Sequence, residues 1–132
     1  MELIIDNGYS RAEYYPDLKV IYTYSKGLVN VELGKEAMLA QQKHGLEHGL
    51  EGIVVDFSEL KGTFTSVNEW TEKVFFPPLL DNGLKCTAMV VSPDVFAHFA
   101  IKDIVKKMGS FEIQIFKDLD SAWEWVKERI KQ

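Results

Sequence analysis

The sequence predicts an α/β fold in the order β-β-α-β-α-β-α-β-α, a mainly parallel sheet with an N-terminal antiparallel hairpin. Residues 53–57 and 86–91 are short, almost uninterrupted apolar runs, which is typical of strands buried on both faces. Segments of helical composition alternate with these runs, and such alternation implies right-handed crossovers in a parallel sheet. A length of 132 residues suits one domain, so we expect residues 1–132 to form a single domain.

The N-terminal part of the chain predicts the hairpin. Residues 15–18 place proline second in a four-residue turn, where its fixed φ suits a type I turn. The flanking segments, residues 11–15 and 19–24, are rich in strand-forming side chains and should pair antiparallel. Asn7-Gly8 marks an earlier tight turn that holds the N-terminal segment.

The first helix is predicted over residues 31–49, where Glu, Lys, Ala, Met, Leu and Gln dominate. Asn30 can cap its start. The apolar stripe of this helix is poor, and Gly34 and Gly45 each weaken it by roughly 1 kcal/mol.

The second helix carries the best start signal in the chain. Ser66 and Glu69 fit a capping box, in which the hydroxyl accepts from an amide of the first turn while the carboxylate reaches back. The apolar face that follows consists of Val67, Trp70, Thr71, Val74 and Phe75. Pro77-Pro78 removes two amide donors and should end or sharply kink the helix, and Gly83 should close a last turn.

The last third predicts a helix, a strand and a helix. Ser92-Pro93 gives an N-cap followed by proline at the first helical position, for a helix that extends to about Lys107. Residues 111–115 alternate strictly between apolar and polar, so this strand should be half exposed and near an edge. Asp118 should cap a final helix over residues 119–130.

Composition argues against several classes of function. The chain has 15 Lys and Arg against 20 Asp and Glu, a net charge of −5, which argues against a nucleic-acid or other large phosphate-binding face. No apolar run approaches the roughly 18 residues that span a bilayer. One cysteine cannot form an internal disulfide, so we expect a cytoplasmic protein.

The sequence contains no complete catalytic or metal-binding pattern. His44 and His48 share one helix face, but no third ligand accompanies them, so we expect solvated histidines and neither metal nor cofactor. Cys86 should be an inert thiol inside a buried strand, and His98 has no nucleophile motif nearby. Asp56, at a strand end, should bond loop amides. We therefore expect a protein that is not an enzyme, and an enzyme that uses His98 or Asp56 is the weakest hypothesis.

Several short motifs, taken in order, resemble the STAS-like domains, in particular the small bacterial SpoIIAA-like (STAS/CRAL-TRIO-like) proteins. The motifs are Ser25-Lys26-Gly27, residues 55–62, Trp70 with Phe76-Pro77, Gly83-Leu84-Lys85, residues 92–96, and Phe116 leading to residues 122–126. The resemblance covers about residues 15–130. It implies a small soluble bacterial module without a known catalytic centre.

The resemblance also points to a regulatory serine. STAS anti-sigma-factor antagonists carry a phosphorylatable serine in an Asp-Ser-Ser-Gly pattern at the start of the helix after the central strand. Here that pattern falls on residues 64–67, so Thr65 and Ser66 keep the hydroxyls while Phe64 and Val67 replace the aspartate and glycine. A phosphate there would meet free amides and a favourable dipole. The alternative is that Ser66 only caps the helix.

Aromatic side chains are in surplus for one core. Phe96 and Phe99 lie mostly outside the apolar stripe of the third helix, so either the Pro77-Pro78 segment covers them or they form a binding or dimer surface. Trp123 and Trp125 are two residues apart and cannot both point into the core.

Two hypotheses for function follow. The favoured one is a non-catalytic regulatory or protein-interaction module, a homodimer or a partner of another protein. The alternative is a small-molecule or lipid carrier with an apolar cavity between the second and third helices. In both hypotheses the contact residues are Trp70, Phe76, Phe96 and Phe99.

Overall fold

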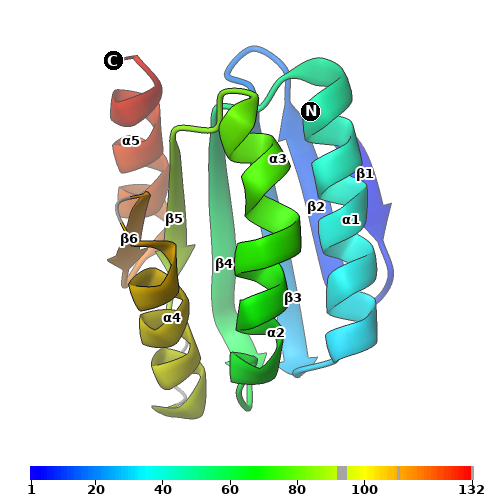
Figure 1. The fold of residues 1–132 in the computed structure, drawn as a ribbon, viewed down its shortest axis with the longest axis vertical. Coiled ribbons are helices and arrows are strands. Elements are labelled where there is room, and N and C mark those ends of the chain that lie inside the picture. Colours follow the sequence, from blue (N-terminus) through cyan, green and yellow to red (C-terminus); the bar gives the residue numbers. More distant parts are fainter. Residues whose placement is uncertain (92–94, 110, 132) are drawn as a thin grey trace.

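The computed structural model describes residues 1–91, 95–109 and 111–131, and of residues 95–99 it describes only the backbone. Within these ranges one six-stranded sheet runs in chain order from β1 to β6 (Figure 1). Its strands are β1 (Glu2–Asp6), β2 (Ser10–Tyr15), β3 (Val20–Leu28), β4 (Gly52–Lys61), β5 (Cys86–Val90) and β6 (Glu112–Phe116). β1, β2 and β3 pair antiparallel, and β3 to β6 pair parallel. The predicted α/β class and its mainly parallel sheet are confirmed.

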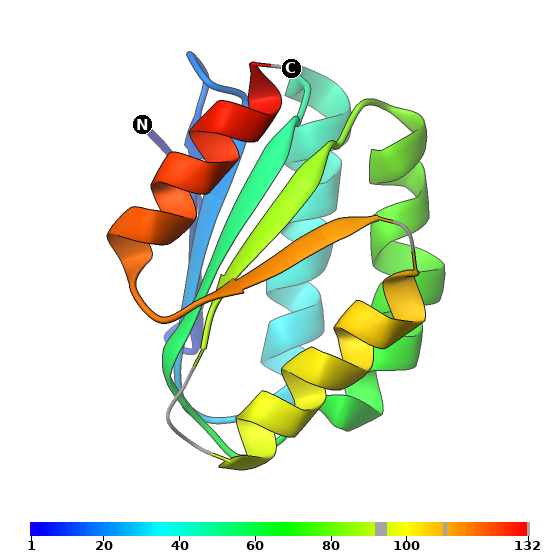
Figure 2. The ribbon, with the colours of Figure 1, turned by 90° about the vertical axis from the view of Figure 1, so that its left-hand side faces the viewer.

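The helices are divided unequally between the two faces of the sheet. They are α1 (Val31–His48), α2 (Thr65–Trp70), the π-helical turn η1 (Thr71–Phe75), α3 (Phe76–Asp81), α4 (Val95–Met108) and α5 (Leu119–Ile130). Each parallel connection passes over the same face, here called the front face, because right-handed crossovers in a sequentially ordered sheet cannot alternate (Figures 1 and 2). Among the described helices, only α5 packs on the opposite, back face.

The sheet has one strand more than the predicted order. β1 forms the edge beside β2, with a register irregularity between Leu3 and Ile5. The predicted turn at Asn7-Gly8 joins it to β2, and the Asn7 side chain accepts from the amides of Tyr9 and Ser10. The same side chain donates to the carbonyl of Leu33 at 2.9 Å, which ties the turn to α1.

Two predicted caps are present. The Asn30 side chain accepts from the Leu33 amide at 3.0 Å, and the Asp118 side chain accepts from the Ser121 amide at 2.8 Å. Gly45, predicted to weaken α1, has a packing role. A Cβ at this position would lie 3.0 Å from the side chain of Leu50 and 3.2 Å from that of Leu79, so only glycine lets α1 approach them.

The predicted capping box at Ser66 is wrong. The helix begins at Thr65, its N-cap position is Phe64, and no side chain caps it. The Val67 amide bonds the Phe64 carbonyl at 2.9 Å, so the turn closes on the backbone and Ser66 stays exposed in the first turn. The capping prediction assumed a helix start that lies too late in the sequence.

Of the two alternatives predicted at Pro77-Pro78, an end or a sharp kink of the helix, the end is wrong. The π-helical turn η1 precedes the prolines, which take the first positions of α3. In an α-helix the Pro78 amide would bond the Val74 carbonyl. Gln42 of α1 supplies the missing donor, since its Nε2 lies 2.8 Å from the Val74 oxygen and 2.9 Å from the Phe75 oxygen.

The π-helical turn changes which side chains face the sheet. The buried residues are Asn68, Thr71, Phe75, Phe76 and Leu79, whereas Val74, predicted on the apolar face, is exposed. Gly83 closes α3 as predicted, with φ of 110° and a bond from the Leu84 amide to the Leu79 carbonyl.

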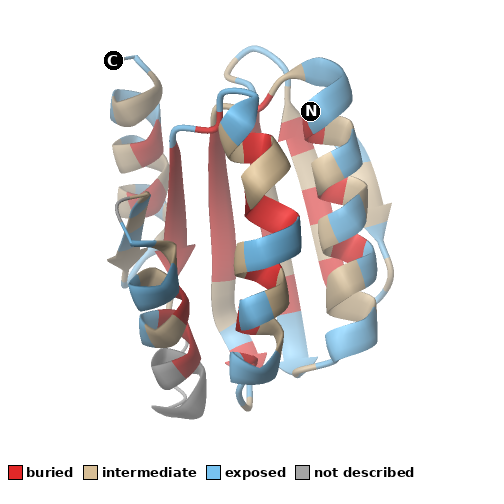
Figure 3. Ribbon diagram, in the orientation of Figure 1, coloured by how far each residue is buried: buried red, intermediate tan, exposed pale blue. Residues whose placement is uncertain are grey.

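The strand predicted to be central is central. In β4, Ile53, Val54, Val55 and Asp56 are buried between the two helical layers, and Figure 3 shows the buried residues concentrated on β4, β5 and the facing sides of the helices. β6 is the half-exposed edge strand that its alternation predicts.

Candidate functional site

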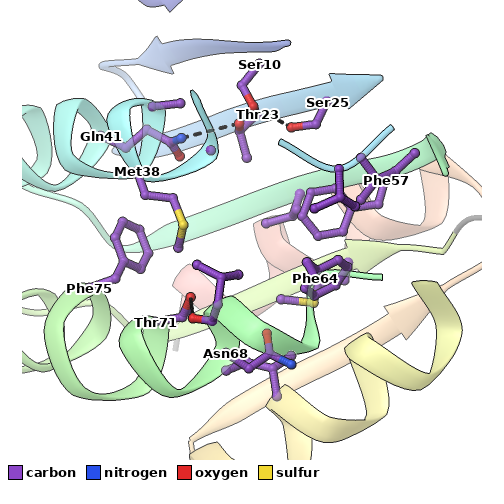
Figure 4. Close-up of a pocket in the computed structure, with 18 of the residues that line it drawn as sticks. Ser10, Thr23, Ser25, Met38, Gln41, Phe57, Phe64, Asn68, Thr71 and Phe75 are labelled. Carbon is purple, nitrogen blue, oxygen red and sulfur yellow. Dashed lines mark hydrogen bonds between the residues drawn. The ribbon is translucent and has the colours of Figure 1, made fainter. Parts of the chain in front are cut away.

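A cavity of about 100 Å³ lies in the front layer, between the sheet on one side and α1 and the α2–η1–α3 segment on the other (Figure 4). Its wall is mainly apolar. The main apolar side chains are those of Met38, Val55, Phe57, Phe64, Phe75 and Met89.

Local sequence explains why the space is left open. Alternate residues of β4 and β5 point to the front face and form the floor. Part of the roof is the face of α1 that carries Ala37 and Gln41, which are buried and four residues apart. These side chains are too small or too polar to fill the layer as a leucine stripe would, so the poor apolar stripe of the sequence becomes a cavity.

Polar side chains meet the cavity at one end, over β2 and β3. The hydroxyls of Ser10 and Ser25 lie 2.6 Å apart across the hairpin. Beside them the Nε2 of Gln41 donates to the Oγ1 of Thr23 at 3.3 Å (Figure 4). All four side chains are buried.

Two further polar side chains reach the cavity from α2 and from β5. Asn68 is 1% exposed, and its Nδ2 donates to the Ala100 carbonyl at 2.8 Å and to Oδ2 of Asp103 at 3.0 Å. Thr87 is fully buried, and its hydroxyl has no hydrogen-bond partner among the described residues. The cavity is therefore apolar with a few inward polar groups, which is the usual composition of a small-molecule site.

Comparison with known families gives one match. A family model described as SpoIIAA-like matches residues 20–127. The chain belongs to the SpoIIAA-like family. No curated protein matches it. Membership confirms the resemblance of the sequence motifs to STAS-like domains, and it indicates a STAS-type regulatory or interaction module from a family that is typically non-catalytic.

Of the predicted contact residues of this SpoIIAA-like chain, the structure describes the side chains of Phe76 and Trp70, and their surroundings differ. Phe76 is buried, lines the cavity and packs against Phe75 and Phe111. Trp70 is half-buried beneath the Lys35 ammonium group and is not part of the cavity wall.

Other predictions for this region concern α4 and the loop before it. The side chains of Phe96, His98 and Phe99 and the predicted start at Ser92-Pro93 lie outside the described residues. The cavity itself differs in place from the prediction: it lies between α1 and α2–α3 rather than between α2 and α4, although Ile104 of α4 contributes to its wall.

Thr65 and Ser66, the predicted phosphate acceptors, are exposed beside the cavity. The residue before them, Phe64, is buried and packs on Phe57 with ring centroids 4.9 Å apart, and both rings line the cavity. The Oγ1 atoms of Thr63 and Thr65 lie 2.8 Å apart. The segment that carries the hydroxyls is thus anchored by a ring in the cavity wall.

The histidine pair of α1 lies with ring centroids 4.3 Å apart, and His44 Nε2 is 3.5 Å from a carboxylate oxygen of Glu2. Within the described ranges, no three His, Cys, Asp or Glu side chains are grouped to hold a metal ion. Burial raises the pKa of the Cys86 thiol to about 11, so the neutral thiol predicted for this strand is present at neutral pH.

The prediction that Asp56 lies at a strand end and bonds loop amides is wrong, because β4 continues to Lys61 and the amide that Asp56 bonds belongs to Ser58 of the same strand. One of its carboxylate oxygens accepts from the Ser58 amide at 3.0 Å and from the Ser58 hydroxyl at 2.7 Å. The other accepts from the Tyr22 hydroxyl at 2.8 Å, and burial together with this bond raises the pKa of Tyr22. In the described part of the chain, no helix is both long enough and apolar enough to cross a bilayer.

Proposed function

We propose that this SpoIIAA-like protein is a non-catalytic regulatory module that binds a small, mainly apolar ligand in the front cavity. The observation that carries this proposal is the cavity itself, which is lined by α1, α2–α3 and the sheet. Ligand binding would add to the interaction role that the family indicates.

Close packing explains why such a space favours a ligand. Protein interiors are close-packed, and a cavity of 100 Å³ that nothing fills costs on the order of 2 kcal/mol of stability. Engineered apolar cavities of about 150 Å³ take up benzene, so this smaller but partly open space suits one small ring, or a two-ring compound that extends to its opening. A bound molecule would restore the missing contacts.

The ligand would act on the start of α2. Phe64 lies in the cavity wall, and the exposed Thr65 and Ser66 follow it directly. A molecule that displaces the Phe64 ring would move these residues, which are the ones a partner protein or a kinase can reach. The cavity and the exposed segment therefore form one responsive unit.

A variant that fills the cavity tests the proposal. Ala37 is buried in the roof, so Ala37→Leu should weaken binding of a hydrocarbon probe, indene, by at least tenfold in calorimetry. The matched control is Val126→Ala, which alters the back core and leaves the cavity intact. Failure of the wild-type protein to bind indene and related ring compounds would overturn the proposal.

A degenerate phospho-switch is a second candidate, because both hydroxyls at the start of α2 are exposed. Phosphate on Thr65 or Ser66 would add negative charge beside the Phe64 anchor. Phosphopeptide mapping of the protein purified from its own cells tests this. Modification should be lost in the Thr65→Ala/Ser66→Ala double variant and kept in Thr63→Ala. An unmodified segment in cells under varied growth conditions would contradict it.

Self-association is the third part of the proposal. α5 packs mainly on β4 and β5, so it covers the back of β2 and β3 only in part (Figure 2). Half-buried rings of Tyr15, Tyr22 and Tyr24 lie there, and Trp123 of α5 contacts the first two. Tyrosine and tryptophan are frequent anchors of interfaces. Light scattering should show a dimer at high concentration, weakened by Tyr24→Ala, and a monomer throughout would count against it.

A further inference from the structure

The floor of the cavity contains a hydroxyl that the fold does not satisfy. Thr87 pairs in register with Ile53 on one side and Ile113 on the other, so it is the polar member of an otherwise apolar row across the sheet. It is fully buried, lines the cavity, and has no hydrogen-bond partner among the described residues. Buried hydroxyls are nearly always bonded, so a ligand group that bonds this one would remove an unfavourable feature of the cavity.

A second polar atom comes from α2, and its chemistry is unambiguous. Both amide hydrogens of Asn68 are used, one by the Ala100 carbonyl and one by the Asp103 carboxylate, and each of these groups can only accept. The amide orientation is therefore fixed, and the remaining Oδ1 is an acceptor. No donor among the described residues reaches it, and Figure 4 shows it directed toward the cavity.

A third polar atom comes from α1. Gln41 is buried and donates through Nε2 to Thr23, which leaves its Oε1 without a donor among the described residues. The three groups thus lie on three different walls, the sheet floor, α2 and α1. Two are acceptors, and the third is a hydroxyl that can either accept or donate.

The charge of the cavity wall further limits the chemical class of the ligand. None of the described residues that line the cavity is Lys, Arg or His. A carboxylate inside could accept from hydroxyls such as those of Ser10 and Ser25, but it would also meet two amide oxygens and no cation, which is an unfavourable arrangement for a buried anion. Fatty acids and other organic anions are therefore poor candidates for this space.

The geometry points to a ligand that is a small, neutral ring compound with at least one hydrogen-bond donor, of the phenol or indole type. The apolar wall would hold the ring, and the donor would reach Oδ1 of Asn68, Oε1 of Gln41 or the Thr87 hydroxyl. This inference rests on the proposed function, because it assigns the chemistry of the same cavity.

Matched probe pairs test the inference by changing the donor and keeping the ring. Indole and indene share their ring shape, but only indole carries an N–H, and phenol and toluene form a second such pair. Calorimetry with the full chain should show at least a tenfold preference for indole over indene and for phenol over toluene. Benzoate, the anionic control, should bind more weakly than phenol.

Three single variants locate the acceptor. Thr87→Val keeps the side-chain shape and removes the hydroxyl, Gln41→Met removes one amide oxygen, and Asn68→Leu removes the other. At least one should reduce the preference for indole to less than threefold while indene binds as before. The isosteric Thr87→Val variant keeps the test valid should Asn68→Leu fail to fold, since its own fold can be checked by circular dichroism.

The outcomes separate this inference from the proposed function. Equal affinity for indole and indene, tighter binding of benzoate than of phenol, or a preference unchanged in all three variants would overturn the inference and leave a ligand-binding cavity standing. Binding of none of the probes would overturn both.

Discussion

The two faces of the sheet are packed in opposite ways. On the back face α5 comes so close to β4 that a Cβ added at Gly52 would lie 2.7 Å from Cγ1 of Val126. On the front face, side chains of the same strand line a cavity of about 100 Å³ beneath α1 and α2–α3. The same strand contributes to both layers, so the difference in packing comes from the side chains of the helices that cover it.

The contrast between the two faces supports a functional site in the front layer. The back core is apolar and closely packed at Gly52, which stabilises the sheet. The front layer contains a cavity, and its polar groups at Asn68 and Thr87 lack a full set of partners among the described residues. Each of these features lowers stability. Features that cost stability and recur in one place are typical of a functional site.

The largest expected effect is that of Gly52→Ala on the back face. The new Cβ would collide with Val126, which is fully buried and cannot move aside, so the free energy of unfolding should fall by about 2 kcal/mol. Urea denaturation measures this. The double variant Gly52→Ala/Val126→Ala should regain part of the loss, and additive losses in the two single variants would contradict the collision.

Gly34→Ala is the matched change on the front face and should have the opposite sign. A Cβ there would lie 3.5 Å from the Tyr9 ring, an ordinary contact, within a regular helix. Alanine should therefore stabilise the protein by about 0.5–1 kcal/mol. Equal losses from both glycine variants would remove the contrast between the faces.

The next effect concerns alkaline pH and Cys86 of the back core. Burial raises the pKa of its thiol to about 11 from an ordinary value near 9.0, so the folded state holds this proton more tightly than the unfolded state does. The contribution to stability is complete below about pH 9 and is lost as the pH rises toward 11. We expect a loss of up to about 2 kcal/mol across that range.

The control for the pH effect is Cys86→Ala. Its stability should depend less steeply on pH between 9 and 11 than that of the wild type, as measured by urea denaturation at each pH. Tyr24, whose pKa is raised to about 12 by its bond with Glu59, is present in both proteins and cancels in the comparison. Identical pH profiles would show that the thiol is not buried in a neutral form.

A further expected effect, similar in size to that of Gly34→Ala, is that of Thr87→Val on the cavity floor. This change removes an unbonded hydroxyl and keeps the volume, so the ligand-free protein should gain about 1 kcal/mol in the free energy of unfolding. Thr23→Val is the control, because Thr23 accepts from Gln41 and its loss should destabilise. A loss of stability in both variants would mean that the Thr87 hydroxyl has a partner after all.

The sequence by itself determined the elements whose ends depend on local bonds. Asn30, Asp118 and Gly83 cap or close their helices through bonds between near neighbours in the chain, and the apolar run at residues 53–57 became the central strand. Sequence motifs also identified the SpoIIAA-like family, because their order along the chain follows the order of its turns and strands.

Tertiary structure alone decided the features that depend on distant partners. Pro77-Pro78 predicts a helix end or a sharp kink, and the helix continues because Gln42, far away in the sequence, donates to the carbonyl that Pro78 leaves unpaired. The cavity likewise depends on residues that are far apart in the sequence. Gln41, Asn68 and Thr87 are inconspicuous in the sequence, and only the packing of α1 and α2 over the sheet brings them around one space. Helix-capping bonds join residues that are close in the sequence, whereas the shape of a cavity depends on all the elements that form its walls.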